Sequence, residues 1–372
     1  MASRRTNFAA VAAVLFSIIA VCKGDLKSGA SFVFGDSLVD SGNNNYLPTL
    51  SKADIRPNGI DFKASDGEPT GRFTNGRTIA DISGELLGQR RYAPPFLAPN
   101  TSGSVLLDGV NYASGGGGIL NATGKLFVNR LGMDIQVDYF NITRKQLDDL
   151  LGKAKAKEFL TKKSIFSITI GSNDFLNNYL LPVVSAGTRV AESPDNFIND
   201  LISNLKNQLT RLYTLDARKF VVANVGPIGC IPYQKTINNV AENECVSLPN
   251  QLARQYNGQL RDLLAELNDN LPGAKFCLAN VYDLVYELIN NYEHYVGFKT
   301  ASKACCGNGG SYAGIVPCGP TSSMCNDRSD YVFWDPYHPS EAANLILAKY
   351  IVDGDTKYIS PINLRQLLAL DD

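Results

Sequence analysis

Short apolar segments, separated by longer stretches with helical periodicity, constrain the fold of this chain more than any other feature. Five such segments are rich in Val, Ile or Phe, as is typical of strands buried on both faces: Ser31–Phe34, Val105–Ala113, Ser164–Ile170, Lys219–Asn224 and Ala274–Ala279. Apolar residues recur at helical spacing in Asn196–Tyr213, Gln251–Leu267 and Ser340–Val352. Strands that alternate with helices predict an α/β fold, a three-layer α/β/α sandwich around a five-stranded parallel sheet.

The chain shows no internal repeat and no linker long enough to separate two domains, so we expect one domain over residues 25–372. The segment Ser41–Arg77, rich in Gly, Asn and Pro, is expected to be a long loop that overhangs the end of the first strand. The net charge is −1 and neither half is strongly basic. Nothing therefore indicates a nucleic acid or an anionic membrane surface as partner, and the oligomeric state leaves no mark on the sequence.

The first 24 residues have the pattern of a signal peptide. Arg4 and Arg5 precede an apolar run from Phe8 to Val21, and the small residue Gly24 marks the expected cleavage site. The run is shorter than the ~20 apolar residues that a membrane span needs, although an uncleaved anchor is the alternative. No other apolar stretch reaches membrane length, so a secreted protein without stable membrane insertion is expected.

Seven cysteines lie beyond the expected signal peptide, which carries Cys22. Four of them crowd into a short stretch and predict two local disulfides with three possible connectivities: Cys305, Cys306, Cys318 and Cys325. A zinc site is the rival interpretation, but the stretch lacks histidine and the spacings do not match a paired C-x-x-C site. Cys230 and Cys245 are a third candidate pair, and Cys277 in an apolar run is expected to be a buried free thiol.

Three asparagines begin N-x-Ser/Thr triplets, namely Asn100, Asn121 and Asn141. In an exported chain these are candidate glycosylation sites on surface loops.

Ser37 and His338 are the candidate nucleophile and base. Ser37 directly follows the first predicted strand, at the edge of the sheet where open α/β folds bind ligands, although a helix-capping role is the alternative. A serine hydroxyl needs a base, and the chain has only two histidines. His294 lies in a polar stretch and is expected to be solvated, whereas His338 sits between prolines, three residues after Asp335. Asp335 is therefore expected to orient His338 toward a serine, unless the pair only secures the start of the last helix.

Backbone and side-chain donors for an oxyanion are expected after the second and third strands. Four glycines, Gly115–Gly118, allow a close approach of backbone N–H groups, and the amide of Asn173 follows the third strand. The glycines match neither a phosphate-binding P-loop nor a dinucleotide fingerprint, but a merely flexible turn remains an alternative. No serine lies in G-x-S-x-G, so the nucleophile elbow of the α/β-hydrolases is absent.

Four ordered segments of the chain resemble the motif blocks of the GDSL esterases/lipases, within the SGNH hydrolase superfamily. They are Phe34–Asn44, Gly109–Gly116, Gly171–Asp174 and Asp335–Pro339. The plant branch is the most similar, given Cys305-Cys306-Gly307 and the segment Asn326–Asn344. The resemblance implies a flavodoxin-like fold with Ser37 as nucleophile and Asp335 and His338 as acid and base. It also implies an oxyanion hole made of the Ser37 and Gly116 N–H groups and Asn173, with no metal and no cofactor.

We therefore expect a secreted serine carboxylic-ester hydrolase that acts on a small-molecule or lipid ester, located in the plant apoplast or cell wall if the resemblance holds. An acyltransferase that passes the same acyl-enzyme to an alcohol has identical catalytic residues and stays an alternative. A non-catalytic lipid- or carbohydrate-binding glycoprotein and a structural secreted glycoprotein are alternatives of other classes, and the intact Ser, Asp and His disfavour them.

Overall fold

A six-stranded sheet forms the centre of the molecule. The computed structural model describes residues 29–181, 193–295 and 297–370, so the expected signal peptide lies outside the described residues. The first five strands are parallel and are β1 (Ala30–Gly35), β2 (Gly109–Asn111), β3 (Ser164–Thr169), β4 (Lys219–Ala223) and β5 (Lys275–Ala279). Their spatial order, β2-β1-β3-β4-β5, is the flavodoxin-like order, so the expected five-stranded parallel sheet is confirmed.

Two details of the sheet differ from the sequence-based expectation. Only Gly109–Asn111 of the second predicted strand is extended, because residues Gly103–Asp108 form a 3₁₀ helix, and Gly109 follows it with a positive φ of 98°. A sixth strand, β10 (Ile359–Ser360), pairs antiparallel with β5 at the edge of the sheet. Two residues are too few to show a strand period, so the sequence pattern did not reveal β10.

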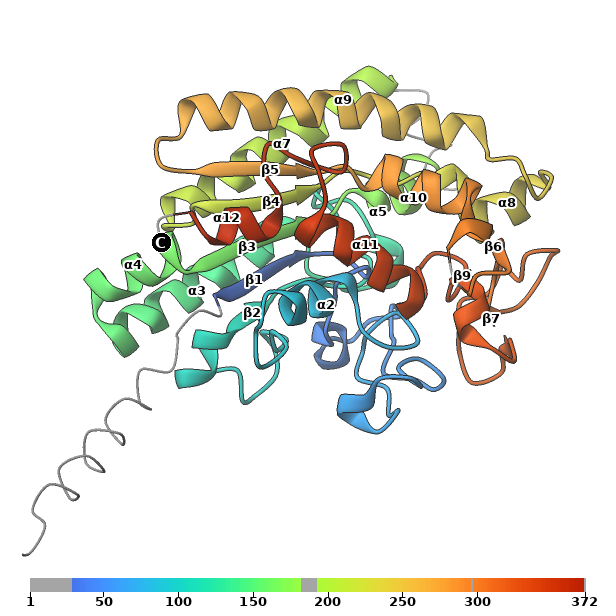
Figure 1. Cartoon of the computed structure of the whole chain (residues 1–372), viewed down its shortest axis with the longest axis horizontal. Helices are drawn as coiled ribbons and strands as arrows, with labels where there is room; N and C mark the ends of the chain where they lie inside the picture. The colour runs from blue at the N-terminus through green and yellow to red at the C-terminus, as the bar shows by residue number, and fades with distance from the viewer. Residues whose placement is uncertain (1–28, 182–192, 296, 371–372) are drawn as a thin grey trace, which may run out of the picture.

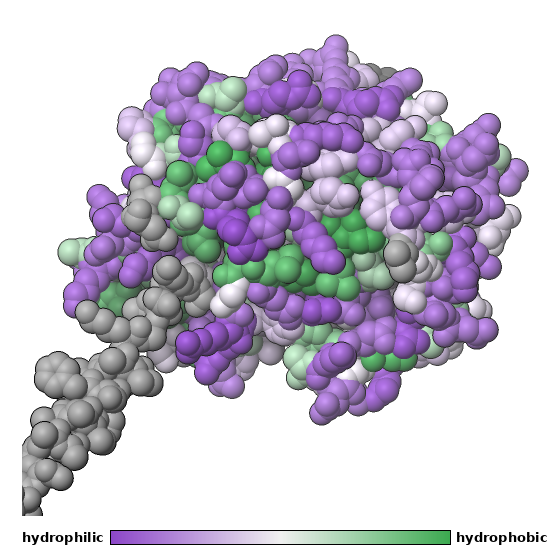
Figure 2. Space-filling view, viewed as in Figure 1, coloured by the Kyte–Doolittle hydropathy of each residue, from purple (hydrophilic) through white to green (hydrophobic). Residues whose placement is uncertain are grey.

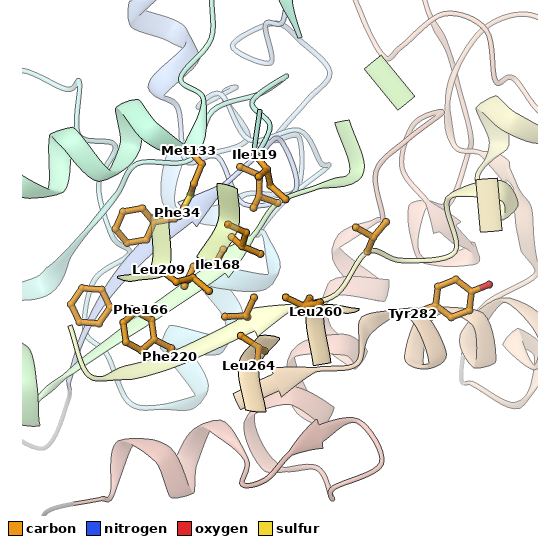
Figure 3. Packing of buried hydrophobic residues seen from close by; sticks show 14 of the residues in the cluster. Phe34, Ile119, Met133, Phe166, Ile168, Leu209, Phe220, Leu260, Leu264 and Tyr282 are labelled. Carbon is orange, nitrogen blue, oxygen red and sulfur yellow. The ribbon is translucent and has the colours of Figure 1, made fainter. Parts of the chain in front are cut away.

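Three long helices cover one face of the sheet. They are α3 (Met133–Leu151), α7 (Pro194–Thr214) and α9 (Ser247–Asn270), and the last two correspond to helices expected from apolar periodicity. The main hydrophobic core lies between these helices and the strands, where Phe34, Phe166 and Phe220 interleave with helical residues such as Leu209 and Leu260 (Figure 3). The aromatic rings of Phe166 and Phe220 lie 5.7 Å apart between centroids, which links neighbouring strands across this core.

Shorter helices cover the opposite face. They are α2 (Ile79–Leu86), α11 (Glu341–Asp353) and α12 (Leu364–Leu368), and α11 and α12 cross the near side of the strands in Figure 1. Alternate strand residues such as Val221 and Cys277 point to this side and pack with Ile351 and Leu367. The expected helix over Ser340–Val352 is α11, whose start is capped by the Ser340 hydroxyl accepting from the Ala343 N–H. The strand period thus places helices on both faces, as expected for a three-layer sandwich.

Three disulfides stabilise the loops at the C-terminal end of the strands. The bridges are Cys230–Cys245, Cys305–Cys325 and Cys306–Cys318, and Cys277 is a buried free cysteine. The adjacent bridges of Cys305 and Cys306 secure two small sheets, β6 (Thr300–Ala304) with β9 (Tyr331–Phe333) and β7 (Cys306–Gly307) with β8 (Ser323–Met324). Sulfur atoms paired in disulfides do not bind zinc, so the rival interpretation of this stretch is wrong.

The surface bears on two further expectations. Asn100 and Asn121 are exposed in turns, whereas Asn141 lies inside α3 and is partly buried, so the expectation of a loop is wrong for Asn141. Whether any of the three carries a glycan stays a prediction. In the described ranges, every helix is too short or too polar to cross a bilayer.

Candidate active site

Ser37 lies on a tight turn directly after β1. The backbone reverses because the Val39 and Asp40 N–H groups both donate to the Asp36 carbonyl, 3.3 and 3.1 Å away. The side chain of Ser37 therefore projects from the C-terminal edge of the sheet, and its Oγ lies 2.7 Å from Nε2 of His338. The two residues are separated by 301 positions, so this contact is made by the fold and not by local sequence.

Asp335 and His338 occupy a tight loop between β9 and α11. The Nδ1 atom of His338 lies 2.8 Å from both carboxylate oxygens of Asp335. Asp335 Oδ1 also accepts from the backbone N–H groups of Tyr337 and His338, so the carboxylate cannot rotate away from the ring. Both side chains are buried, Asp335 at 3% exposure and His338 at 8%. With Nδ1 held by the carboxylate, Nε2 faces Ser37.

The long loop between β1 and α2 packs against this pair. The Phe73 ring lies 5.4 Å from the imidazole of His338, centroid to centroid, and the Thr74 hydroxyl donates to the Pro339 carbonyl. The indole N–H of buried Trp334 donates to Asn58 Oδ1 in the same loop. The expected overhang of Ser41–Arg77 is therefore present, and it shields the imidazole from solvent.

The three expected oxyanion donors line the cavity that contains Ser37. In the described part of the chain, the backbone N–H groups of Ser37 and Gly116 have no hydrogen-bond acceptor. The Nδ2 group of Asn173 donates one hydrogen to the Gly117 carbonyl at 2.9 Å, and its Oδ1 accepts from Asn177. The second Nδ2 hydrogen has no acceptor among the residues that the structure describes, so the side chain is held in one orientation and still has a donor for a substrate oxygen. Of the four glycines, Gly116 is the one that lines this cavity.

Asp40 connects the turn after β1 to the glycine loop, a contact that the sequence analysis did not assign. Its buried carboxylate accepts from the N–H groups of Gly42, Asn43 and Gly115, at 2.7 to 3.0 Å. Burial raises the pKa of Asp40 to about 6, although these backbone donors oppose the shift. Asp40 lies in the first motif block, which is the only sequence signal that it matters for the site. The block does not show that its carboxylate binds the glycine loop.

Asp36 is a second buried carboxyl group beside the nucleophile that the sequence analysis left without a role. It is 1% exposed, its Oδ1 accepts from the Leu38 N–H, and its Oδ2 has no partner among the described residues. Burial raises the pKa of Asp36 to about 7, against the lowering effects of the Leu38 N–H and of His338. The acid form is therefore substantially populated near neutral pH.

The second histidine lies apart from this site. His294 is exposed in the 3₁₀ helix Tyr292–His294, as the sequence predicted. In the described ranges, no group of three or more His, Cys, Asp or Glu side chains is arranged to hold a metal ion.

Comparison with known proteins assigns the chain to a family. A family model of GDSL-like lipases/acylhydrolases matches residues 32–351. The chain belongs to this family. One relative, a GDSL esterase/lipase of Arabidopsis thaliana, is 72% identical over 91% of this chain and 87% of its own length. A second GDSL esterase/lipase of that plant is 64% identical over 95% of both chains, and GDSL esterase/lipase 7 is 43% identical over 92% of both. The four motif blocks of the GDSL chain supply Ser37, Gly116, Asn173 and the Asp335–His338 pair to one cavity.

Proposed function

We propose that this GDSL protein is a serine hydrolase that cleaves carboxylic esters through an acyl-enzyme on Ser37. The observation that carries the proposal is the unbroken chain of contacts from Asp335 through His338 to the Ser37 hydroxyl, each 2.7–2.8 Å long. This arrangement suits a serine because a hydroxyl becomes a useful nucleophile only when a base removes its proton.

His338 acts first as base and then as acid. Its Nε2 takes the Ser37 proton as Oγ attacks the ester carbonyl, and Asp335 stabilises the imidazolium through Nδ1. The protonated Nε2 then donates to the leaving alcohol, which departs and leaves the acyl group on Ser37. A water molecule repeats the sequence at the acyl-enzyme, releasing the acid and restoring the serine hydroxyl.

The negative charge that develops on the carbonyl oxygen is stabilised by the N–H groups of Ser37 and Gly116 and by Asn173. Support comes from the free donors at all three positions and from their shared cavity. Because the donors are held by the fold before the substrate binds, little reorganisation is needed in the transition state.

We further propose that the protein is exported after removal of residues 1–24. Three disulfides support an oxidising compartment, since such bridges are rare in reducing cytosol. Because the relatives are plant proteins and the disulfides favour an oxidising compartment, the proposed location is the apoplast or cell wall. The near-neutral net charge supports the proposal of no nucleic-acid partner.

The decisive test is covalent labelling with a fluorophosphonate probe, coupled to hydrolysis of p-nitrophenyl acetate. The wild-type protein is expected to be labelled on Ser37, and Ser37→Ala to lose both labelling and hydrolysis while keeping the wild-type circular dichroism spectrum. Unchanged hydrolysis in folded Ser37→Ala would refute the nucleophile. Release of free acid in water, without a requirement for an added alcohol, would distinguish a hydrolase from an acyltransferase.

A further inference from the structure

The two faces of the sheet are covered unequally. The face that carries the main core is covered by α3, α7 and α9, with 19, 21 and 24 residues, and by the shorter α4 (Lys153–Lys162). The face toward the viewer in Figure 1 carries helices of only 8, 13 and 5 residues. Figure 2 shows the result on the near side, where a band of hydrophobic residues is visible between hydrophilic borders. Space is therefore left between this face of the sheet and its helices.

A cavity of about 420 Å³ occupies this space and also reaches the nucleophile. Its outer arm opens at the C-terminal edge of the sheet, where Leu126, Phe127 and Tyr233 line it beside Ser37. Its inner arm runs between the sheet and the short helices and is lined by Ile79 and Ser83 from α2, Ser167 from β3, Ala223 from β4, Leu347 from α11 and Leu364 from α12.

Two strand residues under the inner arm, Ser167 and Ala223, are small and leave room between the larger Val33, Ile165 and Val221 and the helices. Ser167 lies in the middle of the central strand β3 and is nevertheless partly exposed, whereas its neighbours Phe166 and Ile168 on the opposite face are completely buried. Ala223 occupies the adjacent strand in the same orientation. A larger side chain at either position would fill the space that the short helices leave.

The inner arm is long and has no ionisable side chain of the described residues along it. It extends from Ser37, on the turn after β1, back along the strand to Ser31, and the part beside β1 alone covers four residues, or roughly 13 Å at about 3.3 Å per residue. In the described part of the chain, the ionisable side chains that line the cavity are Asp36, Lys52, Asp335, His338 and Tyr233 with Tyr337, and all of these lie at the outer end. A ligand for the inner arm must therefore be mostly apolar, apart from a few hydroxyls such as those of Ser83 and Ser167.

We infer that the inner arm binds the aliphatic chain of a long, unbranched acyl group, so that the preferred substrates are long-chain acyl esters. This inference rests on the proposed function, since it concerns the acyl half of the same ester. The acyl group stays on Ser37 after the alcohol has left, so it can occupy a deep arm through both steps. The alcohol and the incoming water need the outer arm, which opens to solvent.

The test uses p-nitrophenyl esters that differ only in the acyl chain, from acetate to palmitate. Wild-type kcat/KM is expected to rise with chain length, by up to about fourfold for each methylene that becomes buried. Ser83→Leu and Ser167→Leu narrow the inner arm from opposite walls. Each is expected to lower kcat/KM for palmitate by about tenfold or more and to change acetate hydrolysis little.

Matched controls retain the open arm. Ser83→Ala and Ser167→Ala remove the hydroxyls without adding bulk, and both are expected to keep the wild-type preference for long chains. Failure of the proposed function is a separate result, because Ser37→Ala would then hydrolyse acetate normally. If both leucine variants fail to fold, a measurement on the wild-type protein decides: a long-chain alkyl fluorophosphonate must label Ser37 faster than its ethyl analogue.

Three results would overturn the inference. One is a wild-type enzyme with no preference for long acyl chains or long-chain probes. Another is a pair of folded leucine variants whose palmitate and acetate activities fall equally or not at all. The third is a pair of leucine variants that keep the wild-type chain-length profile but change their oligomeric state in size-exclusion chromatography. That result would assign this face to self-association.

Discussion

The Nε2 atom of His338 lies 2.7 Å from the hydroxyl oxygen of Ser37, although the two residues belong to opposite ends of the chain. The serine is placed by β1 and the histidine by the loop before α11, so the relative position of these two elements determines the contact. The loop between β1 and α2 holds the histidine in place, because Phe73 packs on the imidazole and the Thr74 hydroxyl donates to the Pro339 carbonyl.

Replacement of Asp335 by asparagine is expected to lower kcat by about 10⁴-fold. The amide cannot favour the tautomer of His338 that leaves Nε2 free to accept the Ser37 proton, and it does not stabilise the imidazolium. Steady-state hydrolysis of p-nitrophenyl acetate measures the effect. Asp353→Asn is the control, because that carboxylate forms a half-exposed ion pair with Arg365 and should leave kcat within twofold. Comparable losses in both variants would argue against the role of Asp335.

Asn173→Ala is expected to lower kcat by about 10²–10³-fold and to change KM little. An oxyanion donor acts mainly on the transition state, so its loss leaves ground-state binding nearly intact. Since Asn173 also donates to the Gly117 carbonyl, thermal unfolding must be measured beside the kinetics. Asn291→Ala, at an exposed position after α10 (Val281–Asn290), serves as the control. A rise in KM at constant kcat would instead assign Asn173 to substrate binding.

Gly116→Ala is expected to reduce both stability and activity. Gly116 has a φ of 83°, and an added Cβ would lie 2.5 Å from the Phe127 ring. Strain and overpacking of this kind cost about 1–3 kcal/mol each, and relief by a shift of the loop would displace the Gly116 N–H. Activity is expected to fall tenfold or more together with the free energy of unfolding.

The matched control for Gly116 is Gly258→Ala, in the middle of α9, where an added Cβ has no neighbour within 4 Å. Alanine there should stabilise the protein by about 0.5–1 kcal/mol through its helix propensity. Chemical denaturation of both variants provides the comparison. A Gly116→Ala protein as active and as stable as the wild type would contradict the proposed geometry of the glycine loop.

The sequence predicted the parts of the fold that depend on long apolar patterns. Four strands and the helices α7, α9 and α11 lie close to their expected bounds, because burial on both faces and helical periodicity both leave a signal in the residues. The predicted second strand is too long at its N-terminal end, since Val105 and Leu106 are apolar but belong to a 3₁₀ helix. Local hydrophobicity does not distinguish these two conformations over so few residues.

The site was predictable in its residue types but not in its supporting contacts. Ser37 and His338 stood out because one follows a strand and the other is one of only two histidines. The bond from Gly115 to Asp40 spans 75 positions, and nothing in the residue pattern indicates it. The inner arm of the cavity was equally hidden, since it arises from short helices and small strand residues that come together only in the fold.

Three buried carboxyl groups near the site make the stability depend on pH. Burial raises the pKa of Asp36 to about 7 and the pKa values of Asp40 and Asp174 to about 6, all from the ordinary value of 3.8 for an aspartate. Between pH 4 and 7 the folded protein therefore binds more protons at these sites than the unfolded chain does. Under that condition the free energy of unfolding falls as the pH rises.

The melting temperature is therefore expected to be higher at pH 5 than at pH 7.5. Toward lower pH the trend reverses, because Arg72 and Arg328 lower the pKa values of Asp81 and Asp61, whose ion pairs are lost on protonation. Asp36→Asn removes the carboxyl group with the highest of the three pKa values. The melting temperature of this variant should therefore fall less between pH 5 and pH 7.5. A change of about 1 kcal/mol in the free energy of unfolding moves the melting temperature of a large domain by roughly 2 °C. Differential scanning calorimetry measures a shift of this size. An equally steep decline in Asp36→Asn would show that Asp36 does not titrate in this range.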